Sequence, residues 1–166
     1  MKELGALQKE LKDLIQDEII GDQILLGTKD GDAVTIKGYE QYLPVKTVDE
    51  GSTESDIDAA LAPYFLLQID HIENNGRNEP REVFWNIYIC VYDNSKDNQG
   101  HKDVLLLIEK IEEYFQKHRL LLGSLYIAED SSIESALPDV DNWPYFFGGM
   151  SFSTQIVNEG VEDENI

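Results

Sequence analysis

The segment from Arg81 to Arg119 constrains the fold more than any other part of the chain, because it contains two clear hydrophobic periods. Residues 81–92 alternate, and both sets of positions are largely apolar or aromatic. This pattern predicts a strand covered on both faces, by a helix on one and by another layer or subunit on the other. Residues 102–118 then repeat apolar positions at helical spacing opposite a charged face. The stripe consists of Val104, Leu107, Ile108, Ile111 and Phe115, widened by Leu105 and Tyr114.

The same periods predict the other elements. Lys2–Ile20 carries one apolar stripe and predicts a helix that ends at Gly21. Tyr64–Ile72 alternates, and with the strand at 81–92 it predicts an antiparallel hairpin. Three further strands are predicted at 33–37 with an extension over 38–43 beyond a bulge, at 121–127, and at 145–157 with a bulge or close backbone approach at Gly148–Gly149.

The predicted order is α-β-β-β-α-β-β. Its simplest arrangement is an α+β fold in which one mostly antiparallel sheet carries both helices on one face. The length of 166 residues fits a single domain, placed at 1–157, followed by an acidic tail at 158–166 that we expect to be disordered. Pro44–Pro63 is acidic and poor in large apolar groups, so it predicts a long loop that orders only at a contact.

The charge of the chain excludes several classes of partner. The chain has 33 acidic and 13 basic residues, for a net charge of -20. Binding to nucleic acid or to an anionic membrane needs clustered Lys and Arg, so neither is expected. Partners with basic patches are favoured instead. No apolar run approaches the roughly 20 residues of a membrane span, and the charged N-terminus does not have the pattern of a signal peptide, which predicts a cytoplasmic protein.

No motif in the chain indicates catalysis, a cofactor or a metal. The three histidines, His71, His101 and His118, lack metal-ligand spacing, and Cys90 has no basic neighbour in the sequence. The polar turn at 93–100 departs from a calcium loop at its sixth and twelfth positions. The sequence therefore predicts a protein that is not an enzyme and holds no cofactor.

The aromatic residues exceed what one core face needs. Some of them must lie on the second face or at an edge of the sheet, where aromatic patches mark protein contacts, although core filling alone stays open as an alternative. The residues predicted to form a subunit or partner interface are Tyr39, Tyr42, Tyr64, Trp143, Tyr145 and Phe147.

Taken in order, these segments resemble a known family. An N-terminal helix, a long acidic loop before PYFLLQIDHIE, the strand, turn and helix of FWNIYICVYDNSKDNQGHKDVLLLIEKIEEYF, and the final strand WPYFFGGMSFSTQIV resemble the tail terminator (tail completion) proteins of long-tailed bacteriophages and prophages. The resemblance covers roughly Lys2 to Val157. It implies an α+β fold, a hexameric ring that caps the tail tube, and contacts with the major tail or tube protein and with the head–tail connector. It also implies assembly in the host bacterial cytoplasm and a final location in the virion.

Two alternatives remain open from the sequence. One is another neck or head–tail joining protein of the same particle. The other is an acidic inhibitor that mimics DNA, which the net charge of -20 would suit. A mimic needs carboxylates spaced along one face like phosphates, whereas the acidic residues of this chain are spread over loops, both predicted helices and the tail.

Overall fold

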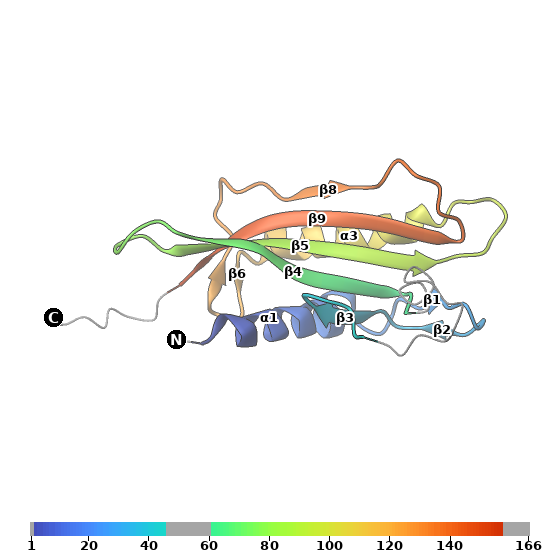
Figure 1. The fold of residues 1–166 in the computed structure, drawn as a ribbon, viewed down its shortest axis with the longest axis horizontal. Helices are drawn as coiled ribbons and strands as arrows, with labels where there is room; N and C mark the ends of the chain where they lie inside the picture. Colours follow the sequence, from blue (N-terminus) through green and yellow to red (C-terminus); the bar gives the residue numbers. More distant parts are fainter. Residues whose placement is uncertain (1, 46–60, 158–166) are drawn as a thin grey trace.

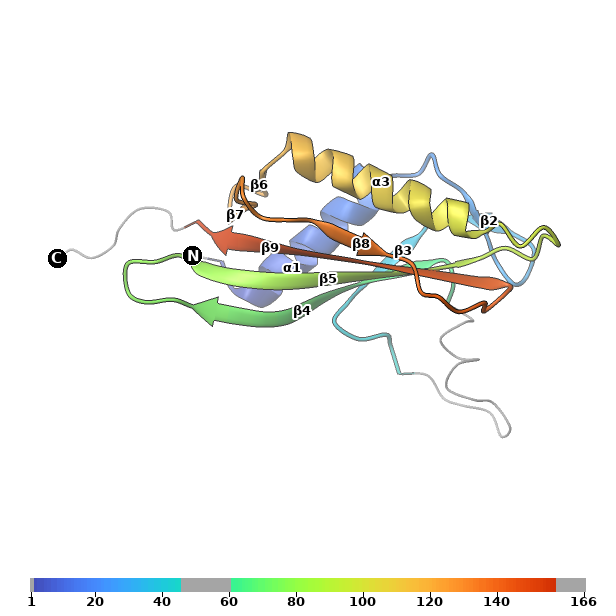
Figure 2. The same ribbon diagram turned by 90° about the horizontal axis from the view of Figure 1, so that it is seen from above.

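Two helical segments pack against one face of a curved, mostly antiparallel sheet, which confirms the predicted α+β class (Figure 1). The computed structural model describes residues 2–45 and 61–157. The predicted loop at 44–63 and the acidic tail at 158–166 therefore lie mainly outside the described residues. Seen from above, α1 and α3 lie on the same side of β4, β5 and β9, as the sequence predicted (Figure 2).

The main sheet has long central strands and short outer ones. Only β3 runs parallel to its neighbour, β4; the other pairs are antiparallel. A separate pair is formed by β1 (Leu26–Gly27) and β2 (Ala33–Val34). The main sheet runs in the order β3 (Lys37–Glu40), β4 (Tyr64–Asn74), β5 (Arg81–Tyr92), β9 (Tyr145–Ile156), β7 (Leu125–Tyr126) and β6 (Leu120–Leu121), and β8 (Glu134–Ala136) also pairs with β9.

The predicted N-terminal helix changes its geometry part-way along. It is α-helical as α1 (Leu4–Asp13) and continues as a π-helix, η1 (Leu14–Ile20), up to Gly21, whose φ of 71° lies in the left-handed region. In η1 the buried residues stand five apart, as Leu14 with Ile19 and Ile15 with Ile20, which matches the i to i+5 hydrogen bonding of a π-helix. The wider turn thus places all four side chains in the core.

The second helix, α3 (His101–Lys117), buries the stripe that its period predicted, although Leu105 is exposed and does not widen it. It comes so close to β9 that a Cβ on Gly148 would collide with Val104 Cγ1. The close approach predicted at Gly148 is therefore present. The bulge predicted there is wrong, because β9 keeps one register with β5 from end to end; the register shift falls in β4, between Ile69 and His71.

Three other predicted elements are wrong in detail. The single strand at 33–43 is two strands, β2 and β3, which belong to different sheets. The predicted strand at 121–127 is instead the end of β6, a tight turn and β7. The chain reverses there because Leu122 and Gly123 take positive φ values of 57° and 70°. The loop at 130–143 contains β8, which pairs with β9. The predicted element order is therefore correct only for its longer members.

A side chain closes the free edge of β4 beyond the short β3. Gln41 leaves β3 with a φ of 64°, and its side-chain amide then pairs with the backbone of Ile69, donating to the carbonyl at 3.1 Å and accepting from the N–H at 2.9 Å. Gln8 of α1 donates to Gln41 Oε1 at 2.9 Å. On the outer side of β3, the N–H of Gly38 donates to Gln16 Oε1 at 2.8 Å.

One buried hydrogen bond ties the centre of the core together. Trp85 Nε1 donates to Thr154 Oγ1 at 2.9 Å, and both side chains are almost inaccessible to solvent. Replacing Thr154 by valine keeps the shape and leaves the indole N–H without an acceptor, which we expect to lower the free energy of unfolding by about 1–3 kcal/mol. Urea denaturation measures this loss. Thr154→Ser keeps the hydroxyl, so a similar loss in the serine variant would assign the effect to packing instead.

Candidate functional site

The face of the sheet that points away from the helices is the candidate site, and we call it the open face. Alternation along the paired strands assigns its side chains, and no helix among the described residues covers it (Figure 2). The open face comprises Tyr64, Leu66 and Gln68 from β4, Phe84, Asn86, Tyr88, Cys90 and Tyr92 from β5, and Tyr145, Phe147, Gly149, Ser151 and Ser153 from β9. Towards the tip of the β4–β5 hairpin it continues with His71, Glu73, Glu82 and Gln155, and on β8 with Glu134 and Ala136.

At the end of the open face nearest β3, aromatic side chains form a second, smaller hydrophobic cluster around Tyr64 and Cys90. Tyr39 meets Tyr64 edge to face, with ring centres 6.3 Å apart, and Tyr92 meets Tyr145 in the same way at 5.4 Å. Partial burial raises the pKa of the Tyr39 phenol, so it stays neutral at physiological pH. This cluster gives the open face a packed end without charged side chains.

The middle of the open face is more accessible. Tyr88 is 45% exposed and Phe147 is 37% exposed, while Leu66 is half-buried beside Tyr88 in the pairing register. Across the strand pair, Tyr88 stands opposite Gly149, and a Cβ placed there would lie 3.7 Å from Tyr88 Cδ1. A Cβ at this distance would make only an ordinary van der Waals contact, so the tyrosine ring packs directly beside the β9 backbone without requiring a glycine.

The open face carries very little charge for so acidic a protein. Over its centre and its end nearest β3, on β4 up to Gln68, on β5 from Phe84 onward and on β9 up to Ser153, no side chain of this face is Lys, Arg, Asp or Glu, although the chain has 33 acidic residues. Carboxylates lie around this uncharged part instead, with Asp70 at the bulge of β4, Glu73 and Glu82 paired near the tip of the hairpin, and Glu134 on β8. Depletion of charge together with abundant Tyr and Phe is the composition of the centre of a protein–protein interface.

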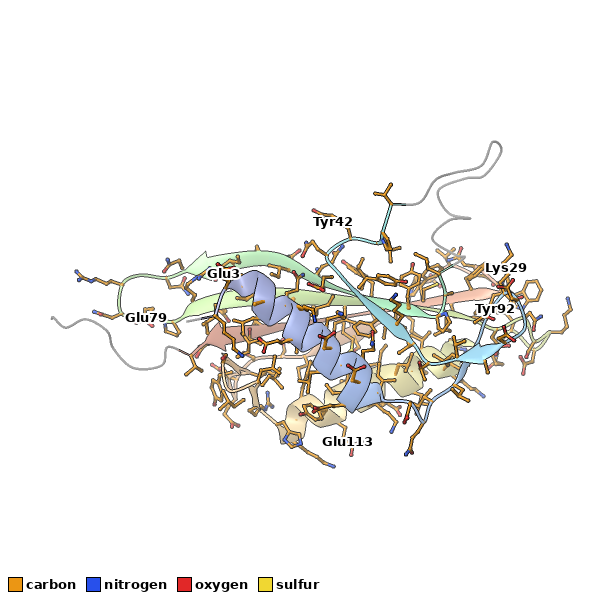
Figure 3. All side chains as sticks on the ribbon, turned by 90° about the horizontal axis from the view of Figure 1, so that it is seen from below. Glu3, Lys29, Tyr42, Glu79, Tyr92 and Glu113 are labelled. Carbon is orange, nitrogen blue, oxygen red and sulfur yellow. The ribbon has the colours of Figure 1, made fainter. Side chains whose placement is uncertain are left out.

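The structure brings together four of the six predicted interface residues. Tyr39, Tyr64 and Tyr145 belong to the aromatic cluster, and Phe147 pairs in register with Cys90 inside it. Tyr42 lies outside it, 77% exposed, on the loop that follows β3 (Figure 3).

Trp143 is held elsewhere, against the turn that precedes α3. Its Nε1 donates to the Ser95 carbonyl at 2.9 Å, and Lys96 Nζ lies 4.7 Å from its ring centre. The interface predicted from the sequence did not include Leu66, Phe84 and Tyr88, which also lie on the open face. Their alternation with core residues on β4 and β5 was the signal that identifies them.

One polar arrangement on this face could suggest acid–base chemistry. His71 Nδ1 lies 2.6 Å from Asp70 Oδ2, and the imidazole ring stacks on Phe84 with ring centres 4.1 Å apart. Among the described residues the imidazole has two carboxylate neighbours, Asp70 and Glu73, whose Oε1 lies 3.7 Å from His71 Nε2, and no Ser, Thr, Cys or Lys side chain is hydrogen-bonded to it as a nucleophile. Within residues 2–45 and 61–157, no three His, Cys, Asp or Glu side chains are grouped to hold a metal ion.

Comparison with known proteins adds no relative. No protein-family model matches the chain, and no curated protein matches it. In the part of the chain that the structure describes, no helix is long and apolar enough to span a bilayer. The functional interpretation therefore depends on the open face and on the resemblance carried by the sequence.

Proposed function

We propose that this protein is a tail terminator of a long-tailed bacteriophage or prophage, which assembles as a ring on the tail tube and joins the tail to the head connector. It acts by assembly and performs no catalysis. Assembly takes place in the host bacterial cytoplasm, and the protein then remains in the tail of the virion. The ring is a hexamer, as the family resemblance implies.

The observation that carries this proposal is the open face. A chain with a net charge of -20 would normally cover its solvated surface with carboxylates, yet the centre of the open face and its end nearest β3 are aromatic and carry no charged side chain. A surface of this composition is typical of protein–protein contacts. Acidic residues elsewhere on the ring would repel DNA and keep it from adhering as it passes through.

A different neck protein of the same particle would use the same kind of face and is the second candidate. The DNA-mimic alternative is less well supported. Described carboxylates lie on α1, on α3, on the turn at 93–100 and on the loop at 137–142, and this distribution does not resemble a phosphate backbone.

Deleting the gene from the phage or prophage that encodes it tests the proposed function. We expect filled heads and unjoined tails by electron microscopy, and rescue by the wild-type chain supplied in trans. Tyr88→Asp and Phe147→Asp, which place charge on the open face, should fail to rescue, while Glu109→Gln on the outer side of α3 should succeed. Normal joined virions in the deletion strain would contradict the assembly role.

Self-association should depend strongly on salt. Subunits that each carry -20 repel one another, and this repulsion opposes ring closure. Raising the salt from about 0.1 M to about 1 M shortens the Debye length from about 10 Å to about 3 Å, so the oligomer fraction should rise. Sedimentation velocity at the two salt concentrations measures the change. A monomer at both salts and at high protein concentration would contradict spontaneous ring formation in solution.

A further inference from the structure

A groove crosses the open face between β5 and β8. Two adjoining hollows form it, of about 220 Å³ and about 410 Å³, and they share Asn86, Glu134 and Ser151. These three residues come from neighbouring strands and lie in one row of the pairing register. The groove is therefore built on the regular sheet.

The groove has a carboxylate at each side of its floor. Asp70 Oδ1 accepts from Asn86 Nδ2 at 3.4 Å, and Glu134 stands at the other end of the row, on β8. Neither hollow is lined by Lys or Arg, and the Glu134 side chain makes no ion pair or hydrogen bond among the described residues. His71 lines the first hollow and its Nδ1 lies 2.6 Å from Asp70 Oδ2, which leaves Asp70 Oδ1 facing Asn86. The next residue, Ser135, donates to Glu112 Oε1 at 2.7 Å, which ties β8 to α3 and fixes the position of Glu134.

Aromatic side chains flank the same row along the strand. Phe84 and Tyr88 stand two residues before and after Asn86 on β5, so both project on the same side, about 7 Å from the middle residue. A cation placed over Asn86 would have a ring on either side along the strand and a carboxylate on either side across it. Both contacts favour a cation.

We infer that this groove binds an arginine side chain presented by a different protein. A planar guanidinium has donors for both carboxylates and for the Asn86 carbonyl oxygen, and it stacks on aromatic rings better than an ammonium does. Charge complementarity identifies the partner. A second copy of this chain would bring its own acidic border and its own charge of -20 against the groove, and a nucleic acid would bring phosphates.

The inference rests on the proposed function only for the identity of the protein that supplies the arginine. Under that function it is the tube or connector protein, which should expose a basic residue where it meets the ring. The groove itself can be tested with the isolated protein, so the two proposals can fail separately.

The probe is a blocked pentapeptide with a central arginine, and its control carries the neutral isostere citrulline. NMR titration of the labelled full chain at about 0.1 M salt should show saturable shifts at Asn86, Tyr88 and Ser151 with the arginine peptide and none with the citrulline peptide. Glu134→Gln should weaken binding about fivefold, whereas Glu109→Gln, which removes the same charge from the outer side of α3, should not. The amide spectrum of each variant confirms that it is folded.

Four results would overturn the inference. Shifts scattered over the acidic surface, with equal effects of the two glutamine variants, would show non-specific attraction. Shifts at the same residues on concentrating the protein without peptide would identify a second copy as the occupant. Saturable shifts there with a short single-stranded DNA would identify nucleic acid. If the arginine peptide does not bind but the wild-type chain rescues the phage, the groove does not bind arginine and the proposed assembly role still holds.

Discussion

Replacing Ile108 by aspartate should unfold the protein at neutral pH. Ile108 is 4% exposed and faces Gly148 of β9, in the layer between α3 and the sheet. An aspartate there would be an unpaired buried carboxylate, which costs several kcal/mol against a total stability of about 5–15 kcal/mol. Far-UV circular dichroism and a thermal melt measure the outcome.

Leu105 provides the matched control on the same helix. It is 37% exposed, so Leu105→Asp should change the free energy of unfolding by less than about 1 kcal/mol. A native melting curve for Ile108→Asp, or equal damage from the two variants, would mean that the buried face of α3 is assigned wrongly.

Truncating Trp85 to alanine should give the second large effect. Trp85 is fully buried, its ring lies nearly parallel to that of Phe152 with centres 6.3 Å apart, and its N–H is satisfied by Thr154. Loss of this side chain should lower the free energy of unfolding by about 3–5 kcal/mol, because the surrounding core cannot fully collapse into the space. Urea denaturation followed by circular dichroism provides the measurement.

The chain has one other tryptophan, which makes the comparison direct. Trp143 is 38% exposed, and its side chain makes one hydrogen bond, to the Ser95 carbonyl, and one contact with Lys96, so Trp143→Ala should cost at most about 1 kcal/mol. Fluorescence separates the two residues, since only Trp85 should emit as a buried indole. Similar losses of stability in both variants would contradict the contrast in burial.

The longest elements were predictable because their side chains repeat over many residues. β5 and α3 each show an uninterrupted period, and one buried face follows from that period alone. The hairpin of β4 and β5 was predictable for a similar reason, since two alternating runs are joined by a polar turn at 74–80. These elements also determine which side of the sheet the helices cover.

The shorter elements depend on partners far away in the sequence. β3 has four residues and pairs in parallel with β4, and its own side chains do not indicate that direction. β6 and β7 are separated by a turn in which Leu122, an unusual residue for positive φ, takes the left-handed conformation. β8 has three exposed residues and is defined by its pairing with β9.

The candidate site was predictable in composition and less so in position. An excess of aromatic residues indicated a second apolar surface, and Tyr39, Tyr64, Tyr145 and Phe147 do gather there. Which exposed aromatics belong to it depends on the tertiary fold. Trp143 is fixed against the turn before α3, whereas Phe84 lies on the face, where its ring stacks on His71 across the bulge of β4.

The glutamine side chains at the β3–β4 edge have a consequence for solubility. An open strand edge is a template on which further chains can pair and grow into fibres. Here Gln41 already occupies the backbone groups of Ile69, and Gln16 occupies the N–H of Gly38, so an incoming strand would first have to displace both. The molecule can therefore reach a high local concentration without polymerising through this edge.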